Sequence, residues 1–541
     1  MNGAHHRREI LTQAILALLA AVLLFWGLGD KYLWQDEAAT AVLAERLLKF
    51  GRPLAYDGVN LVTIDYFATQ DTGTIGDRTG DPKRAVDYYI QRGDFKPDTT
   101  WIWQPWGQFV AAAIGLRLLG ATTLAARLPF ALAGLATVLL LYRLVRRYSY
   151  SWLMASVSAV LLLSNAYWIL HVRQCRYYSL SSLLLVATLM AYLRWQGGRR
   201  WGARAFVLAA WCWFQVDYGT VWPVFAVLFL DALAARRRTF RRTAMVGLAL
   251  SAAMAPFLYY YQLWGRNMEP MRDRGEIFSI NLFNTNEYVA PVLLVLAAVL
   301  LVAWRWKRLE AGERHTVAIA CAILPALLLW VPEVTPEAFL RYTIMAAPLG
   351  SLLGAWVLVR GCGARVARFA WWGALVLVAT PFASLPGRAL VPDFDRYEAK
   401  LLWRSELPMM ASEIFGHRPD PNRLTVEWLR RNAAPSDEIL INYEDLPLMF
   451  YLPNPIRGGI PAFRAEDDAK SPPRFVVLRR SVEFVHKPVF EREIQRYQWA
   501  EAPVKIPDLI WGNNPDPMMW EQYPDEMTYL YLARRVDGKS R

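Results

Sequence analysis

Long apolar stretches recur through the first 385 residues of this 541-residue chain, and they constrain its fold more than any other feature. An α-helix of about 20 apolar residues crosses the roughly 30 Å hydrocarbon layer of a bilayer, and most of these stretches come near that length. They cover 10–29, 126–145, 151–170, 177–193, 203–216, 221–235, 243–261, 288–304, 316–331, 342–359 and 369–385. The pattern predicts a polytopic α-helical membrane protein with about eleven transmembrane helices.

The apolar stretches end near residue 385, and the rest of the chain has a different pattern. Segments of helical and strand character alternate there; the helices are LTVEWLRRNA, DLPLMFYL and VFEREIQRYQWA, and the strands are EILINY, RFVVLRR and TYLYLARR. This alternation predicts a soluble α/β domain at 386–541 after a transmembrane domain at 1–385. All four cysteines precede residue 386, so neither a disulfide framework nor a cysteine metal site is expected in the soluble domain.

The charge distribution gives a topology. Residues 1–385 contain 38 Lys and Arg against 23 Asp and Glu, whereas residues 386–541 contain 22 against 24. The excess lies in short loops between alternate apolar stretches, such as RWQGGRRWGAR and ARRRTFRR. By the positive-inside rule these loops face the cytoplasm, so the excess indicates orientation rather than nucleic-acid binding. We therefore expect the C-terminal domain to be extracytoplasmic.

The same threading leaves further segments outside, namely a long loop at 30–125, the turn 171–179, a loop at 262–287 and the segment 331–341. In the long loop, AVLAERLLKFG and RAVDYYIQRG each read as a helix that ends at a glycine, Gly51 and Gly93. The apolar run 106–120 is too short to span and carries Arg117, so we expect it to lie as a helix in the outer interface.

The adjacent acids Asp36 and Glu37 open the first of these loop helices. Acids at a helix N-terminus are stabilised by its dipole and free N–H groups, so a capping role is one reading. The other reading is catalytic, with Asp36 as a base that takes a proton from an acceptor hydroxyl and Glu37 beside it to position the base or a divalent cation. No set of metal ligands is expected elsewhere.

A second candidate group lies in the outer turn HVRQCRYYS, with His171, Arg173, Arg176 and Tyr177. Arginines are rare at the outer ends of membrane helices, so this pair indicates a bound anion, and the planar guanidinium suits phosphate. Snorkelling to lipid headgroups is the competing reading. His171 has no second histidine at helical ligand spacing, so a hydrogen-bonded structural role is favoured over metal binding.

Two shorter motifs complete the candidates. Arg341 and Tyr342 begin an apolar stretch at the same expected membrane level, which indicates a third anion-binding arginine. Trp103 and Gln104 precede the expected interfacial helix. The first expectation for them is a turn with an aromatic anchor, and the second is a role in lining the substrate path.

The motifs together resemble the C-type glycosyltransferase superfamily, in the branch of the protein O-mannosyltransferases and the lipid A aminoarabinose transferases. The resemblance covers about residues 30–350. It is carried by WQDEAATAVLAERLLKFGRPL, by the run from WQPWGQF to LYRLVRR, by HVRQCRYYSL and by FLRYTIMAAPLG. Family members often have Lys or His where this chain has Gln104 before Pro105, so that cationic phosphate contact would have to come from another residue.

The resemblance implies a membrane glycosyltransferase that moves a sugar from a polyprenyl-phosphate donor to an acceptor hydroxyl of a glycolipid, polysaccharide or protein. It implies Asp36 as the base, with Arg127, Arg176, Arg341 and Tyr342 near the donor phosphate. Lipopolysaccharide modification at the cell envelope would fit such an enzyme. A transporter or flippase of a lipid-linked sugar is the alternative, although the chain lacks the matched pair of broken helices that many transporters have.

The topology gives a first prediction. Reporter tags placed after Arg242 and after Lys307 should be cytoplasmic, and a C-terminal tag should be extracytoplasmic, because Lys and Arg are retained inside. Alkaline phosphatase and fluorescent-protein fusions measure this directly. A cytoplasmic C-terminal tag would invert the whole topology.

Overall fold

The computed structural model describes most of the chain in two compact units. The described residues are 3–63, 86–87, 89–91, 93–149, 151–235, 240–263, 273–335, 337–361, 369–380, 382–388, 406–416, 419–458, 472–480, 495–508 and 529–540. The helical unit comprises Met1–Trp26 and Phe130–Gly416, and the mixed unit comprises Gly27–Pro129 and His417–Arg541. The long loop after the first helix therefore folds in one unit with the C-terminal residues.

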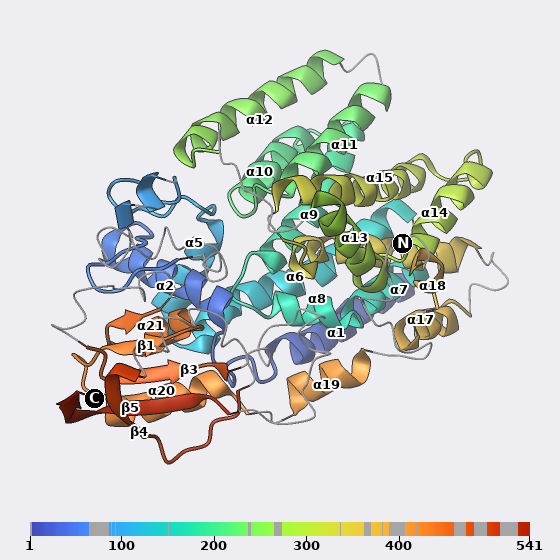
Figure 1. Cartoon of the computed structure of the whole chain (residues 1–541). Helices are drawn as coiled ribbons and strands as arrows, with labels where there is room; N and C mark the ends of the chain where they lie inside the picture. Colours follow the sequence, from blue (N-terminus) through green and yellow to red (C-terminus); the bar gives the residue numbers. More distant parts are fainter. Residues whose placement is uncertain are drawn as a thin grey trace. The chain divides into compact units, whose positions relative to one another are not determined.

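The helical unit consists almost wholly of helices, as Figure 1 shows. They are α1 (Gly3–Phe25), α6 (Thr123–Ser149, which begins in the mixed unit), α7 (Trp152–Leu163), α8 (Ala166–Val172), α9 (Tyr178–Gln196), α10 (Gly202–Phe214), α11 (Val221–Ala235), α12 (Phe240–Tyr260), α13 (Arg274–Asn284), α14 (Val292–Arg305), α15 (Ala311–Val334), α16 (Ala347–Trp356), α17 (Ala370–Ala379), α18 (Leu385–Arg388) and α19 (Leu407–Phe415). Short 3-10 or π turns lie at Thr285–Val289 (η3), Leu340–Tyr342 (η4), Ile344–Ala346 (η5) and Val357–Gly361 (η6).

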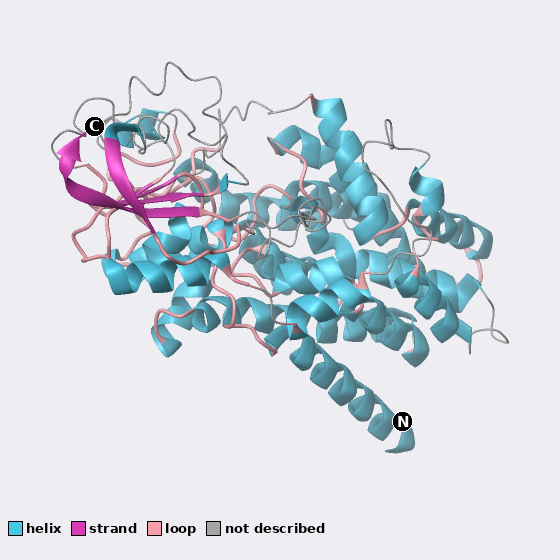
Figure 2. Cartoon of the chain, turned by 60° about the horizontal axis from the view of Figure 1, so that its bottom comes forward, coloured by secondary structure: helices cyan, strands magenta, loops and turns pink. Residues whose placement is uncertain are grey.

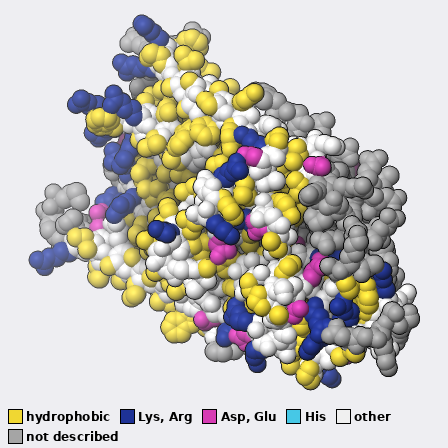
Figure 3. Space-filling view, turned by 90° about the vertical axis from the view of Figure 1, so that its left-hand side faces the viewer, with side chains coloured by type: hydrophobic (Ala, Val, Ile, Leu, Met, Phe, Trp, Pro, Cys, Tyr) yellow, Lys and Arg dark blue, Asp and Glu magenta, His cyan; other side chains and the backbone are white. Residues whose placement is uncertain are grey.

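Five helices within the described residues are long and apolar enough to cross a membrane, or up to seven if each of two bent pairs is one span. The expected eleven spans are therefore not confirmed, because helices such as α10, α11 and α17 have only 10 to 17 residues. Large apolar side chains remain exposed on these helices, for example Leu230 (66%), Leu248 (71%) and Leu300 (69%). Figure 3 shows a broad hydrophobic area with Lys and Arg gathered along one margin, which is typical of a surface that faces lipid.

The described part of the expected loop at 262–287 is helical instead. Asp273 caps α13, because its side chain accepts hydrogen bonds from the N–H groups of Gly275 and Glu276. The helix continues through η3 and meets α14 at a bend of 75°. Asp273 before an apolar run was the sequence signal for this helix, but the charged residues around it favoured the interpretation as a loop.

The mixed unit contains one five-stranded sheet, and Figure 2 shows the strands gathered there. Its strands are β1 (Ile439–Ile441), β2 (Ile456–Arg457), β3 (Phe475–Leu478), β4 (Tyr497–Glu501) and β5 (Tyr531–Ser540), in the order β2-β1-β3-β5-β4. β1 pairs in parallel with both β2 and β3, whereas β5 is antiparallel to β3 and β4. Leu440, Val476 and Ala533 form the buried centre of the sheet.

Most expected elements of the C-terminal sequence are present, with one correction. The helices α20 (Pro421–Asn432) and α21 (Asp445–Tyr451) and the strands β1, β3 and β5 confirm the prediction. The end of the expected helix VFEREIQRYQWA is strand β4 instead, with Trp499 opposite Arg535. Tyr and Trp favour strands, and pairing with β5 gives this segment hydrogen bonds that outweigh its helical pattern.

Two helices of the first loop complete the mixed unit. α2 (Gln35–Phe50) ends at Gly51, whose φ of 74° confirms the expected glycine cap. α5 (Gly107–Leu119) confirms the expected short helix and packs against α2. Its opposite side exposes Val110, Ile114 and Leu118, a stripe at helical spacing that suits an interfacial helix. The second expected loop helix, RAVDYYIQRG, is helical at its described residues 86–87 and 89–91, and Gly93, with φ of 84°, follows it as expected.

A buried ionic network lies beneath α21. Glu444 has a left-handed conformation, with φ of 65°, immediately before this helix. Its carboxylate pairs with the guanidinium of Arg479, and both side chains are almost completely buried. Arg479 also donates to the side-chain oxygen of Asn422 at the start of α20. The network therefore joins the first turns of α20 and α21 to the end of β3.

Glu444 gives a pH-dependent prediction. Burial raises the pKa of its carboxyl from 4.5 to about 7, although Arg479 acts to lower it. Folding thus favours the protonated form, so this stability contribution is present below pH 4.5 and is lost as the pH rises through about 7. Glu444→Gln carries a neutral amide at every pH, so its melting temperature should gain on the wild type between pH 5 and pH 8. Glu427→Gln, at the partly exposed pair with Arg423, is the control. If the difference in melting temperature between Glu444→Gln and the wild type stays constant from pH 5 to pH 8, the raised pKa of Glu444 is contradicted.

Candidate active site

The residues predicted from sequence fall into two groups, one in each compact unit. The mixed unit contains Asp36, Glu37, Trp103, Gln104 and Arg127, and the helical unit contains His171, Arg173, Arg176, Tyr177, Arg341 and Tyr342.

In the mixed unit, Glu37 and Arg127 form a buried bidentate ion pair. The Nε of Arg127 donates to Oε1 of Glu37 at 2.8 Å, and Nη2 donates to Oε2 at 2.6 Å. Glu37 is completely buried, and the Arg127 side chain is 10% exposed. Arg127 also donates to the carbonyl oxygens of Leu28, Lys31 and Tyr32. One guanidinium thus fixes both the start of α2 and the backbone that leads into it.

Asp36 lies in the first turn of α2, between the buried Gln35 and Glu37, and is itself only partly buried. The helix dipole stabilises a carboxylate at this end. The N-cap residue is Trp34, which provides no side-chain cap, so α2 does not begin with an ordinary Asx or Ser/Thr cap. Asp36 is therefore a half-accessible carboxylate on a backbone that its buried neighbours hold, which is the setting that a general base requires.

A chain of side-chain hydrogen bonds connects Gln104 with α2. The side chain of Gln108 donates to Oε1 of Gln104 at 3.0 Å, and the hydroxyl of Thr40 donates to Oε1 of Gln108 at 3.4 Å. Thr40 is four residues after Asp36, on the same face of α2. The structure thus brings Gln104 to the helix that carries Asp36, and Trp103 is half-buried beside it in the chain.

The segment before Asp36 is also held by the C-terminal residues, which sequence reasoning did not foresee. The N–H of Tyr32 donates to Asp420, and the N–H of Leu33 donates to the hydroxyl of Tyr451 at 3.0 Å. The side chain of Gln35 donates to Asp445 at 2.7 Å. More than 380 residues separate these partners in the chain, so no local sequence signal could reveal them.

The candidate residues of the helical unit meet where α8, α9 and the turns η4 and η5 converge. The indole N–H of Trp168 donates to Ser182, and the Ser182 hydroxyl donates to the carbonyl of Met345. These bonds link α8, α9 and η5. His171 is buried, with Nδ1 2.7 Å from the carbonyl oxygen of Tyr167, and it lies within electrostatic range of Arg341. The expected structural hydrogen bond of this histidine is therefore present.

Two predicted aromatic residues and two arginines lie in the same cluster. Tyr177 is within electrostatic range of Arg176 and Tyr342. The guanidinium of Arg176 lies 5.7 Å from the ring centre of Tyr177, and Arg176 is only 6% exposed. The guanidinium of Arg341 lies 4.1 Å from the ring of Phe339. Aromatic faces thus support both cations, as cation–π contacts do.

Arg173 has a different environment from Arg176. Its two terminal nitrogens donate to the carbonyl oxygens of Leu23 and Trp26 at 2.6 and 2.7 Å, at the end of α1. A guanidinium there satisfies carbonyls that the helix leaves unpaired and offsets the negative end of its dipole. The structure therefore separates the two arginines of HVRQCRYYS by their partners.

Asp217 is a member of this cluster that sequence reasoning missed. It lies in the short turn between α10 and α11, where it accepts hydrogen bonds from Thr220 and from Ser181 of α9. It is also within electrostatic range of Tyr177. An acid in a four-residue turn between two apolar stretches was the signal that could have identified it.

The described residues contain no group of three or more His, Cys, Asp or Glu side chains that could hold a metal ion. Asp36 and Glu37 are adjacent, but the carboxylate of Glu37 is engaged by Arg127. The candidate residues that the structure describes are thus a partly buried carboxylate at the start of α2 and arginines beside aromatic rings.

Comparisons with solved structures identify the fold. A crystal structure of ArnT from Cupriavidus metallidurans bound to undecaprenyl phosphate matches with a TM-score of 0.57 and 14% identity, over 98% of each chain. The apo form of that protein matches with 0.56 and 15% identity, over 99% of each chain. The oligosaccharyltransferase of Archaeoglobus fulgidus, tethered to an acceptor peptide, matches with only 0.49 and 12% identity, over 96% of this chain and 73% of that one. No family model matches the sequence, and no curated protein resembles it significantly.

The two ArnT matches confirm the fold that the sequence resemblance implied. The chain has the fold of ArnT over almost its whole length. This covers the membrane helices, the first loop and the small C-terminal sheet.

The ion pair gives a stability prediction. Glu37→Gln should lower the free energy of unfolding by about 3–5 kcal/mol, because it leaves the buried Arg127 without its counter-charge. Thermal unfolding of the detergent-purified protein measures the change. Glu427→Gln, which breaks a partly exposed i,i+4 pair with Arg423, should cost less than about 1 kcal/mol. Equal losses in the two variants would show that the Glu37 pair does not stabilise the fold.

Proposed function

We propose that this protein is a membrane glycosyltransferase that moves a sugar from a polyprenyl-phosphate donor to an acceptor hydroxyl on the extracytoplasmic face. The observation that carries the proposal is the near full-length likeness to ArnT bound to undecaprenyl phosphate. The environment that each candidate residue has within its own unit supports it: Asp36 is a partly buried carboxylate, and Arg176 and Arg341 are cations beside aromatic rings.

Asp36 would act as the general base. Its carboxylate takes the proton of the acceptor hydroxyl while that oxygen attacks the anomeric carbon of the sugar. The bond from this carbon to the phosphate oxygen breaks, and polyprenyl phosphate leaves with the bonding electrons. The buried Glu37–Arg127 pair would hold the backbone of Asp36 rather than contact the substrate.

The leaving phosphate needs positive charge, and Arg176 and Arg341 would supply it. Both guanidinium groups lie against aromatic rings, which limits their motion. Tyr342 would complete the phosphate-binding group, and His171 and Tyr177 would line the substrate path. Arg173, which the sequence predicted as a phosphate ligand, would instead support the end of α1, because its guanidinium donates to carbonyls there. Gln104 and Trp103 would line the substrate path. Preorganised donors of this kind stabilise charge that develops as the bond breaks.

The remaining partners follow from the same chemistry. Nucleotide sugars are absent outside the cytosol, so a lipid-linked sugar phosphate is the donor that suits an outer-face enzyme. The acceptor would be a lipid or glycan of the cell envelope, and the location would be the bacterial inner membrane with the C-terminal residues extracytoplasmic. A divalent cation beside Asp36 would assist, although the reaction as written does not need one.

Asp36→Asn tests the base. Asparagine is nearly isosteric but cannot take up a proton, so turnover should fall by roughly 10²–10⁴-fold. The assay incubates purified protein with undecaprenyl-phosphate sugars and bacterial membrane lipid, and measures free undecaprenyl phosphate. Near-normal turnover in a folded Asp36→Asn protein would return this acid to a capping role.

The same assay separates an enzyme from a transporter. A transferase releases free undecaprenyl phosphate and yields a glycosylated acceptor. A flippase would move the intact lipid-linked sugar between the leaflets of a proteoliposome without releasing either product. Transbilayer movement without cleavage would overturn the proposal.

Arg176→Lys and Arg341→Lys test the phosphate contacts. Lysine keeps the charge but loses the two-pronged hydrogen bonding of arginine, so donor affinity should fall by about 1–3 kcal/mol in each. Titration with undecaprenyl phosphate measures this. Arg143→Lys, at an exposed position of α6 beside Gln13, is the matched control. Unchanged binding in both test variants would favour snorkelling and remove these residues from the site.

A further inference from the structure

We infer that helices α20 and α21 of the C-terminal region position the proposed base Asp36, which makes this region part of the catalytic machinery. The inference rests on the proposed function of Asp36. Its evidence lies wholly within the mixed unit, where the segment 27–37 and the C-terminal helices belong to one compact body.

The contacts concentrate on the four residues immediately before Asp36. Besides the bonds from Tyr32 to Asp420 and from Leu33 to Tyr451, the carbonyl of Leu33 accepts from the side chain of Asn422 at 3.2 Å. The ring of Tyr32 stacks on that of Tyr451 with centres 3.9 Å apart. Both polar groups of the Leu33 backbone are thus held by residues of α20 and α21.

Gln35 extends this anchoring into α2 itself. Its side-chain amide donates to Asp445, and its side-chain oxygen accepts from the N–H of Leu446 at 3.4 Å. Gln35 and Asp445 are both completely or almost completely buried. The first residue of α2 is therefore bonded to the first turn of α21.

These distant contacts replace a local cap. A side-chain cap would normally define where a helix begins, but Trp34 supplies none. The direction in which α2 starts depends instead on Arg127 from α6 and on the groups of α20 and α21. A general base must stay within hydrogen-bond reach of its proton, and a displacement of 1 Å can cost about 100-fold in rate.

Tyr451 is the most informative residue to change. Its hydroxyl accepts from Leu33 and lies 2.6 Å from the hydroxyl of Thr123. Burial raises the pKa of Tyr451, so the group stays a neutral hydroxyl at physiological pH. Tyr451→Phe removes this hydroxyl alone and retains the ring that stacks on Tyr32.

The test is a double-mutant cycle on kcat with undecaprenyl-phosphate sugar as donor. Tyr451→Phe should lower kcat by about 10-fold or more and leave the KM for the donor unchanged, because it displaces the base without touching the donor. Added to Asp36→Asn, it should cause no further loss, since the base it positions is already absent. Tyr531→Phe on β5, which packs on the sheet centre instead, should retain full kcat.

The outcomes distinguish this inference from the function on which it rests. If Asp36→Asn retains activity, the proposed function fails. If Asp36→Asn is impaired but Tyr451→Phe matches the wild type, the positioning role alone is overturned. The inference is also overturned if Tyr451→Phe lowers kcat by the same factor in the Asp36→Asn protein as in the wild type. Tyr451 would then act independently of Asp36.

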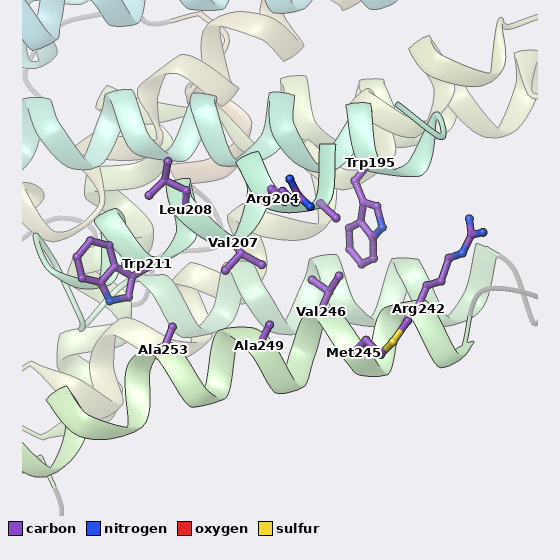
Figure 4. A pocket seen from close by; sticks show the side chains of 11 residues that line it. Trp195, Arg204, Val207, Leu208, Trp211, Arg242, Met245, Val246, Ala249 and Ala253 are labelled. Atoms are coloured by element: carbon purple, nitrogen blue, oxygen red, sulfur yellow. The ribbon is translucent and has the colours of Figure 1, made fainter. Parts of the chain in front are cut away.

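A second inference comes from a groove in the helical unit that shares no residue with either candidate cluster. α10, α12 and the end of α9 line a cavity of about 630 Å³. Figure 4 shows Trp211 and Ala253 toward one end, Ala249 between the ends and Trp195 toward the other. The lining is almost entirely apolar except for Arg204 and Arg242, which lie at the Trp195 end.

We propose that this groove binds one acyl chain of an anionic phospholipid whose headgroup pairs with Arg204 and Arg242. Within the described residues, neither arginine forms an ion pair with an acid. Arg242 and Ala253 are eleven residues apart on α12, a rise of about 16 Å, which is close to half the roughly 30 Å hydrocarbon layer. The groove thus has the length of one leaflet, and its charged end belongs to loops that the sequence places in the cytoplasm.

Native mass spectrometry of the delipidated protein tests this site with phosphatidylglycerol and phosphatidylcholine. The wild type should bind phosphatidylglycerol at least about 10-fold more tightly than phosphatidylcholine, which is the difference expected from one charge-assisted contact. Arg204→Gln/Arg242→Gln should abolish the preference, and Ala249→Phe should weaken binding by filling the groove. Lys307→Gln/Arg308→Gln, a basic pair beyond the end of α14, is the control. Equal retention of both lipids, or equal loss in the control, would overturn the proposal.

Discussion

The buried pair between Glu37 and Arg127 is the interaction on which the candidate active site depends. The carboxylate of Glu37 neutralises the guanidinium of Arg127 inside the mixed unit. Arg127 also donates to three backbone carbonyls of the turn before α2. Each of these hydrogen bonds has a charged donor, and such a bond contributes about 1.5–3 kcal/mol. The backbone position of the partly buried Asp36 is therefore determined by its buried neighbour Glu37.

The first loop and the C-terminal residues form one folding unit, although almost 300 residues of helices separate them in the chain. This arrangement gives the non-helical stretch 51–63 of the loop partners from the C-terminal residues. Asn60, for example, accepts from the N–H of Ile456 and donates to the carbonyl of Asn454, which bind the loop to β2. The small sheet and its helices supply hydrogen-bond partners that water would otherwise provide.

The arginines of the membrane region divide by what their guanidinium groups contact. Arg173 satisfies carbonyls at the end of α1, and Arg388 pairs with the buried Glu287, so both hold the protein's own groups. Arg176 and Arg341 lie against aromatic rings near His171 and Tyr177. The charge pattern of HVRQCRYYS predicted an anion for both of its arginines, and only the folded contacts distinguish Arg173 from Arg176.

The sequence by itself determined that this is a helical membrane protein with a small α/β region, because apolar length and strand or helix periodicity are local properties. It also predicted Asp36 and Arg341 as site residues from their types and positions, and Arg127 from the family resemblance, with which the ArnT-like fold agrees. Only the tertiary structure decided how the helices bend, that YQWA is a strand, and which partners hold Asp36. Those features depend on hydrogen bonds and ion pairs between residues far apart in the chain, such as Leu33 with Tyr451. A single sequence contains no record of such pairs, because their energy exists only after the chain has folded.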